Sequence, residues 1–129
     1  MPASTIPVMR VSQFVLNLTS ERPNQLFRFY RDTLGLEEEE MMGNAVRAGG
    51  AILAFEYHSA TRGGAREPQR CLVSLVVDDL SAEQARIESP GVSFIRRKGL
   101  EPWGGRISTF LDPDGNYVQL VEYRPEGMA

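Results

Sequence analysis

The sequence predicts an α+β fold in which two paired modules, each a strand, a helix and then three strands, form a curved mixed sheet around a cleft. Three observations support this prediction. The same order of elements can be read twice along the chain, which indicates an internal repeat. Several expected strands alternate so that one face is apolar while the other carries amides. Near the C-terminus, strong turn chemistry at residues 112–115 separates two alternating strands and predicts a hairpin.

Composition limits the classes of protein and partner. The chain has 129 residues, 42% of them hydrophobic, which suffices for one compact domain with a real interior. Its net charge of −3, with both signs interspersed, offers no basic face for nucleic acid and no basic amphipathic helix for a membrane. Cys71 is the single cysteine, which excludes an intramolecular disulfide. Because no long apolar run resembles a membrane span or a secretory segment, a cytoplasmic location is expected.

The first module is expected over about residues 10–58, after a loose N-terminal arm. Pro23 follows two hydroxyl residues and marks a helix start, because proline is favoured at the first helical position. Gly35 is a good end for that helix. The strands expected in this module are 11–18, 36–42, 44–48 and 51–57.

The second module is expected over about residues 70–124, after a linker at 59–69, and the two modules form a single domain over 1–129. Ser81 is expected to cap its helix, with Gln84 reaching back to the helix start. The strands expected here are 71–77, 92–97, 106–111 and 117–123.

The strand faces that carry amides are expected to line a small-molecule pocket between the modules. Apolar and aromatic walls would supply affinity, and a few convergent polar groups would orient the ligand. The alternative is a cavity filled by side chains. The residues expected to line the cleft are Gln13, Val15 and Asn17 on the first strand, Leu53 and Phe55 on the fourth, Leu72 and Ser74 on the fifth, and Tyr117 and Gln119 on the last.

Two loop residues extend this candidate ligand site. Trp103 lies in a Pro-Trp-Gly-Gly context before the penultimate strand, where it could be a stacking platform for a planar ligand or a hydrophobic plug. Arg106 beside it could pair with an anionic group of a ligand or with a carboxylate of the protein itself.

Four segments resemble the glyoxalase, bleomycin-resistance and extradiol-dioxygenase superfamily, also called vicinal oxygen chelate. They are residues 29–36 (FYRDTLGL), 76–80 (VVDDL), 102–104 (PWG) and 112–116 (DPDGN), and the resemblance extends from Val11 to Tyr123. It implies paired modules, a U-shaped sheet around a cavity and, commonly, a homodimer. The fold hosts lyases, isomerases, dioxygenases, thiol transferases and proteins that bind drugs without catalysis, so function must be argued from the site.

Metal enzymes of this family draw ligands from the first, fifth and last strands, and in some cases from the fourth. Alignment on the motifs implies Gln13, Leu72, Gln119 and Leu53 at those positions. Two amides and two leucines make a poor metal site, because divalent ions require charged or imidazole donors. We therefore predict no catalytic residues, metal or cofactor, but a protein that binds a hydrophobic or aromatic small molecule. The alternative is a divalent-metal-dependent lyase, isomerase or dioxygenase of the same superfamily.

Four further residues have a functional and a structural interpretation. Glu56 and Glu122 would enter the cleft only if their strands were inverted, so solvated or helix-side carboxylates are expected. His58 is the only histidine and is expected on the surface, since no partner is evident that would make it a general base. Cys71 is expected to be a buried, inert thiol.

Overall fold

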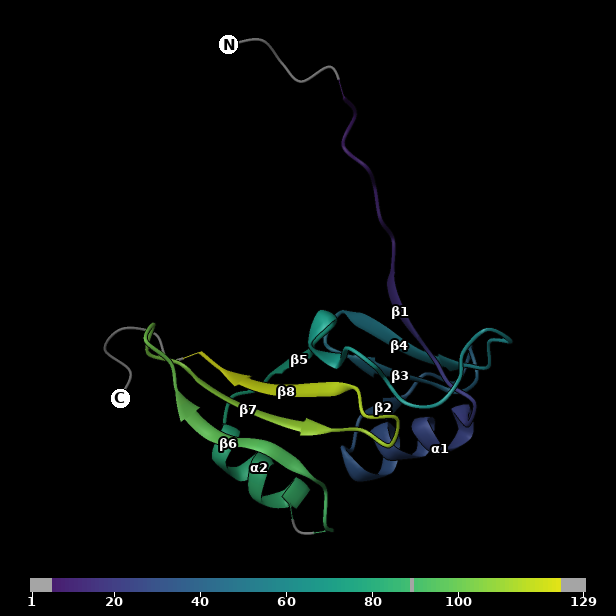
Figure 1. Cartoon of the computed structure of the whole chain (residues 1–129). Helices are drawn as coiled ribbons and strands as arrows, with labels where there is room; N and C mark the ends of the chain where they lie inside the picture. The colour runs from purple at the N-terminus through teal and green to yellow at the C-terminus, as the bar shows by residue number, and fades with distance from the viewer. Residues whose placement is uncertain (1–5, 89, 124–129) are drawn as a thin grey trace.

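Two four-stranded mixed sheets form the body of the protein (Figure 1). The computed structural model describes residues 6–88 and 90–123. The first sheet has the order β1-β4-β3-β2, and the second repeats this arrangement as β5-β8-β7-β6. In each sheet the first and last strands of the module pair in parallel, and the remaining pairs are antiparallel. The strands are β1 (Phe14–Thr19), β2 (Glu37–Glu38), β3 (Ala45–Ala48), β4 (Ala51–Glu56), β5 (Val73–Val76), β6 (Phe94–Leu100), β7 (Arg106–Leu111) and β8 (Tyr117–Glu122).

The helix of the first module begins and ends at the expected residues. Helix α1 (Pro23–Arg28) has the proline in its first turn and continues into a short π-helical segment, η1 (Phe29–Thr33). The chain then turns at Gly35, whose φ of 82° lies in the left-handed region that glycine adopts without strain. None of the helices in the described residues is long and apolar enough to cross a membrane.

The second helix, α2 (Leu80–Glu88), is capped differently from the prediction. The carboxylate of Asp79, not the hydroxyl of Ser81, accepts the backbone N–H of Ala82 at 3.1 Å. Gln84 does not reach back either, because its side-chain oxygen accepts the backbone N–H of Lys98 at 2.8 Å. The capping prediction was wrong by two residues, because Asp79 and Ser81 are both good caps and the sequence alone does not choose between them.

Apolar residues of both sheets pack against the two helices in one core. In the first module, Leu53 and Phe55 of β4 pair in register with Leu16 and Leu18 of β1 and belong to this core. The prediction that Leu53 and Phe55 face the cleft with Asn17 was therefore wrong. In the second module the core includes Phe110, Val118 and Leu120, packed with Leu80 and Ile87 of α2. Burial of each such side chain stabilises the fold by about 1.5–3 kcal/mol.

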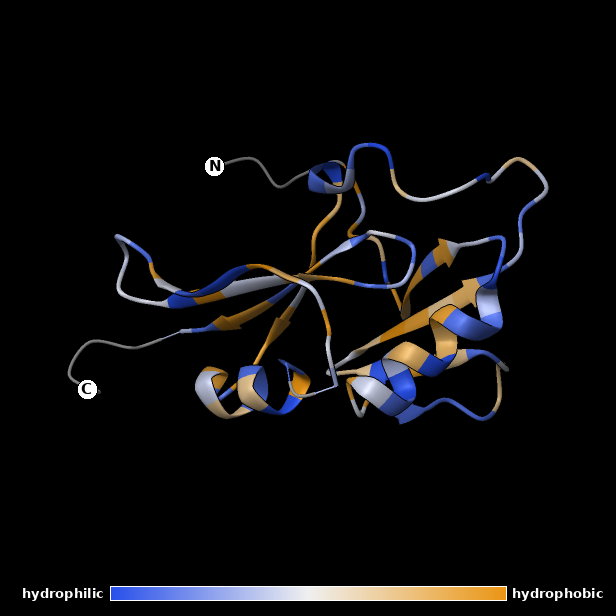
Figure 2. Ribbon diagram, turned by 60° about the horizontal axis from the view of Figure 1, so that its bottom comes forward, coloured by the Kyte–Doolittle hydropathy of each residue, from blue (hydrophilic) through white to orange (hydrophobic). Residues whose placement is uncertain are grey.

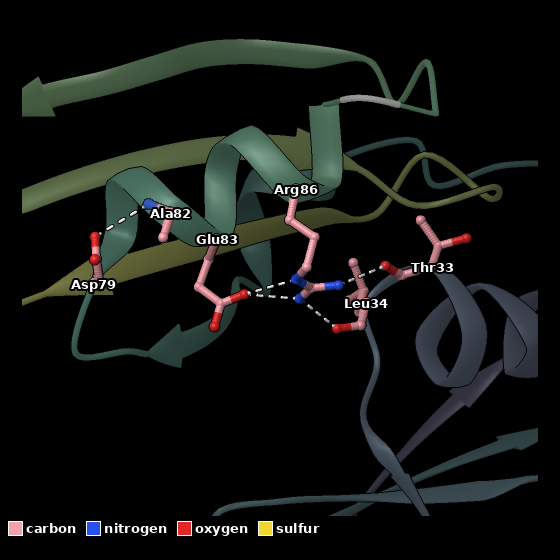
Figure 3. A network of polar contacts seen from close by, with 6 residues as sticks. All are labelled: Thr33, Leu34, Asp79, Ala82, Glu83 and Arg86. Atoms are coloured by element: carbon pink, nitrogen blue, oxygen red, sulfur yellow. Dashed lines mark hydrogen bonds and ion pairs between the residues drawn. The ribbon is translucent and has the colours of Figure 1, made fainter.

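The two modules meet on the helix side of the molecule. Both helices lie below the sheets in two views (Figures 1 and 2). The rings of Phe29 and Phe110 come from different modules, and their centroids are 6.3 Å apart. The Arg86 side chain of α2 also reaches across to the first module, where its guanidinium donates to the backbone oxygens of Thr33 at 3.3 Å and Leu34 at 2.8 Å (Figure 3).

Candidate functional site

We call the face of the first sheet that points away from α1 the open face. It carries the predicted amide of Asn17. Register places Val15 and Asn17 of β1 beside Ile52 and Ala54 of β4, and Val15 packs with these two residues in a small second cluster. The Asn17 amide donates a hydrogen bond to the Glu56 carboxylate, so Glu56 lies on the open face as well. Glu56 is an exposed carboxylate at the strand end, which agrees with the solvated alternative of the two that were expected, but it does not lie on the helix side. Gln13 precedes the strand, and its amide donates to the backbone oxygen of Gly50 at 3.2 Å, which ties the start of β1 to the β3–β4 turn.

The open face of the second sheet has a hydrogen-bonded polar pair on the edge strand β5 and its neighbour β8. Ser74 of β5 and Gln119 of β8 are register partners, and the Ser74 hydroxyl donates to the Gln119 side-chain oxygen at 3.0 Å. Because the side-chain oxygen of Gln119 accepts this bond, the NH₂ group of the same amide points away from Ser74. No hydrogen bond from this NH₂ group to a described residue is found. Val76, Tyr117 and Val121 flank the pair on the same face by strand alternation. The arrangement presents an amide donor between apolar and aromatic side chains.

A hollow of about 760 Å³ lies between the modules, and its lining extends from α2 to residues of β5. Its wall is largely aliphatic and includes Leu16, Ala51 and Leu53 from the first sheet and Leu75, Ile87 and Leu120 from the second module. Of the residues predicted for the cleft, it touches Leu53, Leu72 and Ser74. Asn17 and Gln119 do not line this hollow, whereas Ser74 and Val76, on the open face of the edge strand β5, border it.

Trp103 forms an aromatic pair with Tyr123 just beyond the end of β8. The two ring centroids are 5.5 Å apart, and Trp103 keeps 51% of its surface exposed. The ring lies directly over Gly105, where an added Cβ atom would overlap it. Half of the indole surface is therefore accessible in a single chain. Tyr123 was missed by the sequence analysis, although it follows the alternation of Tyr117 and Gln119.

Arg106 binds a carboxylate of the protein itself. Its guanidinium donates to the Glu122 side chain at 3.1 Å, and the two residues are register partners on β7 and β8. Glu122 is 6% exposed and also accepts the backbone N–H of Leu80 at 2.9 Å, where α2 begins. Glu122 therefore lies on the helix side, as expected, and it draws Arg106 to that side.

Two candidate residues remain, His58 and Cys71. The prediction for His58 is confirmed, and the prediction for Cys71 is wrong. His58 is exposed, as predicted, and its Nδ1 accepts the backbone N–H of Ala60 at 3.0 Å. Cys71 is exposed at the rim of the hollow, so its prediction as a buried thiol was wrong. Strand β5 begins at Val73, two residues later than expected, which leaves Cys71 in the preceding loop.

The donor set on the open faces does not fit a catalytic divalent metal. Where the fourth strand was expected to contribute Leu53, the open-face residue is Ala54, which has no donor atom. Gln13 and Gln119 offer neutral amides and Leu72 offers nothing. Within residues 6–88 and 90–123, no three His, Cys, Asp or Glu side chains gather closely enough to hold a metal ion. Glu56, which already accepts a hydrogen bond from Asn17, is a single carboxylate on the open face, too few charged donors to compensate a divalent ion for the loss of its hydration shell.

Comparison with known proteins supports the fold and places it in a family. The model of the Glyoxalase/Bleomycin resistance protein/Dioxygenase superfamily matches residues 11–120. A search of the curated proteins found no significant match. Among solved structures, a member of this superfamily from Sphaerobacter thermophilus is 24% identical, with a TM-score of 0.70, over 90% of this chain and 100% of that chain.

Two other solved structures share the fold. Lactoylglutathione lyase from Agrobacterium tumefaciens is 19% identical, with a TM-score of 0.67, over 92% of this chain and 98% of that one. TioX from Micromonospora sp. ML1 is 18% identical, with a TM-score of 0.66, over 87% of this chain and 98% of that one. At these identities the similarity shows the fold alone.

Proposed function

Because the chain belongs to the Glyoxalase/Bleomycin resistance protein/Dioxygenase superfamily, we propose that it binds a hydrophobic or aromatic small molecule at the open faces of its sheets, without a catalytic metal. One observation carries this proposal. The open-face positions of the parallel pairs β1–β4 and β5–β8 hold amides, a hydroxyl, aliphatic groups and the single carboxylate of Glu56, with Gln119 and Ser74 hydrogen-bonded to each other in the second sheet. Such a surface can bind and orient a ligand but offers no charged set of metal donors.

The Gln119 amide is the group best placed to orient a ligand. Its oxygen is occupied by the Ser74 hydroxyl at 3.0 Å, so its NH₂ group is the part available to donate. A carbonyl or other acceptor of the ligand would receive this bond, while Val76 and Tyr117 contact its apolar body. Trp103 and Tyr123 would extend the surface at the end of β8, where a planar ring can stack on the half-exposed indole.

The proposed ligand site is completed by a second copy of the chain. In one copy the sheets are not closed, and Val76 on the open face of β5 keeps 59% of its surface exposed. A homodimer that brings the open face of one first module against the open face of the partner's second module would enclose the ligand on two sides. Apolar pockets gain affinity when water is excluded from both sides of the ligand.

The test is a ligand screen followed by two variants and a control. Thermal shift with a panel of aromatic antibiotics and aromatic metabolites selects a ligand, and isothermal titration measures its dissociation constant. Gln119→Leu and Trp103→Ala are each expected to weaken binding about tenfold or more, because one orienting bond or one stacking surface is lost. Gln25→Leu, an exposed amide on α1, is the matched control and leaves affinity unchanged. Unchanged affinity in both test variants would place the ligand elsewhere.

A metal-dependent enzyme is the second candidate, and one observation favours it. Glu56 presents a carboxylate on the open face beside Asn17, which is the side where a metal of this superfamily would be expected. One carboxylate with neutral amides is still a weak set. Elemental analysis after incubation with nickel, zinc, manganese or ferrous iron, and then desalting, separates the two candidates. If the wild-type protein retains near-stoichiometric metal and the Glu56→Gln variant does not, the result would support the metal-dependent enzyme and contradict the proposal of a metal-free binding protein.

A further inference from the structure

The hollow between the modules is a space that the side chains of the chain leave unfilled. Its volume of about 760 Å³ lies within the range of pockets that bind small molecules, roughly 300–1,000 Å³. Both modules contribute aliphatic side chains to its wall, among them Leu16, Leu53, Leu75 and Ile87. Protein interiors are normally close-packed, so an apolar hollow of this size is a candidate binding site.

The wall of the hollow is aliphatic rather than aromatic. Of the described residues that line it, only Phe14 carries an aromatic ring, and that ring belongs to a side chain that is 59% exposed. The interior therefore offers no ring on which a planar molecule stacks. It favours the burial of a saturated chain or ring, because removal of aliphatic surface from water is favourable and needs no directed contact.

The wall is polar where the hollow reaches α2. Glu83 and Arg86 line it there and form an ion pair of 2.8 Å (Figure 3). Both contacts of the guanidinium with Glu83 reach the same carboxylate oxygen, Oε1. The other oxygen, Oε2, accepts no hydrogen bond from the part of the chain that the structure describes. The backbone oxygens of Thr33 and Leu34 hold Arg86 in place, so the free Oε2 is a positioned acceptor.

The charges of this ion pair select for a neutral ligand. A ligand carboxylate in the hollow would lie close to the Glu83 carboxylate, and a ligand ammonium would lie close to the Arg86 guanidinium. Each charge would lose its hydration without a partner of its own, which is costly in an apolar site. A hydroxyl, in contrast, donates to the Oε2 atom of Glu83 and leaves the ion pair intact. Hydrogen bonds to a charged acceptor are stronger than those between neutral groups.

We infer that the hollow binds an uncharged aliphatic molecule that carries a hydroxyl at one end. Its hydrocarbon body lies against Leu16, Leu75 and Ile87, and its hydroxyl donates to Glu83. This inference goes beyond the proposed function, which assigns a different ligand to the open faces around Gln119. Because the hollow and the second open face share a border at β5, the two sites are tested with separate variants.

A ligand series on the wild-type chain tests the preference for a neutral molecule. The probes are 1-decanol, decanoate and decylammonium, which share one hydrocarbon chain and differ in charge. Isothermal titration is expected to give a dissociation constant about tenfold lower for 1-decanol than for either ion. In Glu83→Gln the positive charge of Arg86 is no longer balanced, so the advantage of 1-decanol over decanoate is expected to disappear. Glu67→Gln is the matched control, since Glu67 pairs with Arg70 outside the hollow and leaves the order unchanged.

A variant that fills the hollow tests where the hydrocarbon chain lies. Ala51 is half-buried and lines the hollow, so Ala51→Phe places a ring in the proposed path of the chain. Circular dichroism establishes that this variant is folded, and its affinity for 1-decanol is expected to fall about tenfold or more. Ala85→Phe is the matched control, because Ala85 is exposed on α2 and does not line the hollow.

Cys71 reports on occupation of the hollow without any substitution. It is the single cysteine of the chain, and it is exposed at the rim of the hollow. Its alkylation by iodoacetamide is followed by mass spectrometry, with and without saturating 1-decanol. The alcohol is expected to slow alkylation severalfold in the wild-type chain and to have no effect in Ala51→Phe.

Each of four results would overturn the inference. A folded Ala51→Phe that binds 1-decanol as tightly as wild type places the chain outside the hollow. Equal affinity for 1-decanol and either ion shows adsorption of hydrocarbon without recognition by Glu83. Absence of 1-decanol binding, with alkylation that slows as the protein concentration rises, shows that a second copy covers the hollow. Loss of 1-decanol binding in Gln119→Leu moves the alcohol to the open face, whereas unchanged binding there supports a separate site, whatever the aromatic screen finds.

Discussion

The phenol of Tyr30 donates a hydrogen bond of 2.8 Å to the carboxylate of Asp112, and this bond joins the end of the first helix to the last turn of the chain. The same carboxylate accepts the backbone N–H groups of Asp114 at 2.9 Å and Asn116 at 3.0 Å, and the Asn116 amide at 2.8 Å. Asp112 thus organises the turn of the second module and receives a buried donor from the first. The relative position of the two modules depends in part on this one carboxylate.

Tyr30→Phe is expected to destabilise the protein by about 1–3 kcal/mol, because the ring still fills its site while the buried Asp112 carboxylate loses a donor. Urea unfolding monitored by circular dichroism measures the change. Tyr57→Phe is the control, since Tyr57 is 62% exposed and is expected to change stability by less than about 0.5 kcal/mol. Equal effects of the two substitutions would contradict a special role for the Tyr30 bond.

The same phenol predicts a loss of stability at alkaline pH. Burial, reinforced by the neighbouring Asp112 carboxylate, raises the pKa of Tyr30 well above its ordinary value of 10.0. The folded protein therefore keeps this proton where the unfolded chain releases it. The stability contributed by the raised pKa is fully present below about pH 10 and is lost as the pH rises further, by at most about 1.4 kcal/mol per pH unit.

Urea unfolding of wild-type protein and Tyr30→Phe at several values between about pH 9 and pH 11 tests this dependence. The difference in unfolding free energy between the two proteins is expected to shrink above pH 10, because other titrating groups cancel in the subtraction. A difference that stays constant across this range would show that Tyr30 titrates normally in the folded state.

Arg86 is expected to matter more than an ordinary surface arginine. It donates to two backbone oxygens of the first module, at Thr33 and Leu34, and its ion pair with Glu83 at 2.8 Å holds it in place (Figure 3). Arg86→Met keeps the aliphatic stem but removes these bonds, and we expect a loss of about 1–2 kcal/mol in urea unfolding. Arg70→Met removes only an exposed ion pair of 3.5 Å with Glu67 and should cost less than about 0.5 kcal/mol.

Gly105→Ala is expected to displace the indole of Trp103 from its place beside Tyr123. A Cβ at this position would overlap the Trp103 ring, and the backbone of Gly105 is not in the left-handed region, so the conflict is steric and not conformational. Trp103 is the only tryptophan, so its fluorescence emission should shift to longer wavelength as the ring enters water. Gly50→Ala, where a Cβ meets nothing within 4 Å, is the control. An unshifted spectrum in Gly105→Ala would contradict the packing.

Signals that depend on a few neighbouring residues were read correctly from the sequence. Pro23 starts the first helix, Gly35 ends it, and residues 112–115 form the turn of the last hairpin. These features follow from dihedral limits of proline and glycine and from local hydrogen bonds of aspartate, which need no distant partner. The repeated order of elements then sufficed for the α+β fold class and for the family resemblance that the comparisons confirm.

The faces of β4 could be decided only by the tertiary structure. Residues 51–55 are all apolar, so alternation carries no information about which side is buried, and the choice is made by pairing with β1 some 37 positions earlier in the chain. That pairing turns Leu53 and Phe55 to the helix and Ala54 and Glu56 to the open face. The exposure of Cys71 and the inter-module hollow depend likewise on packing between distant segments. Local chemistry thus determined where the elements begin and turn, whereas long-range packing decided which side chains they present to a ligand or a partner.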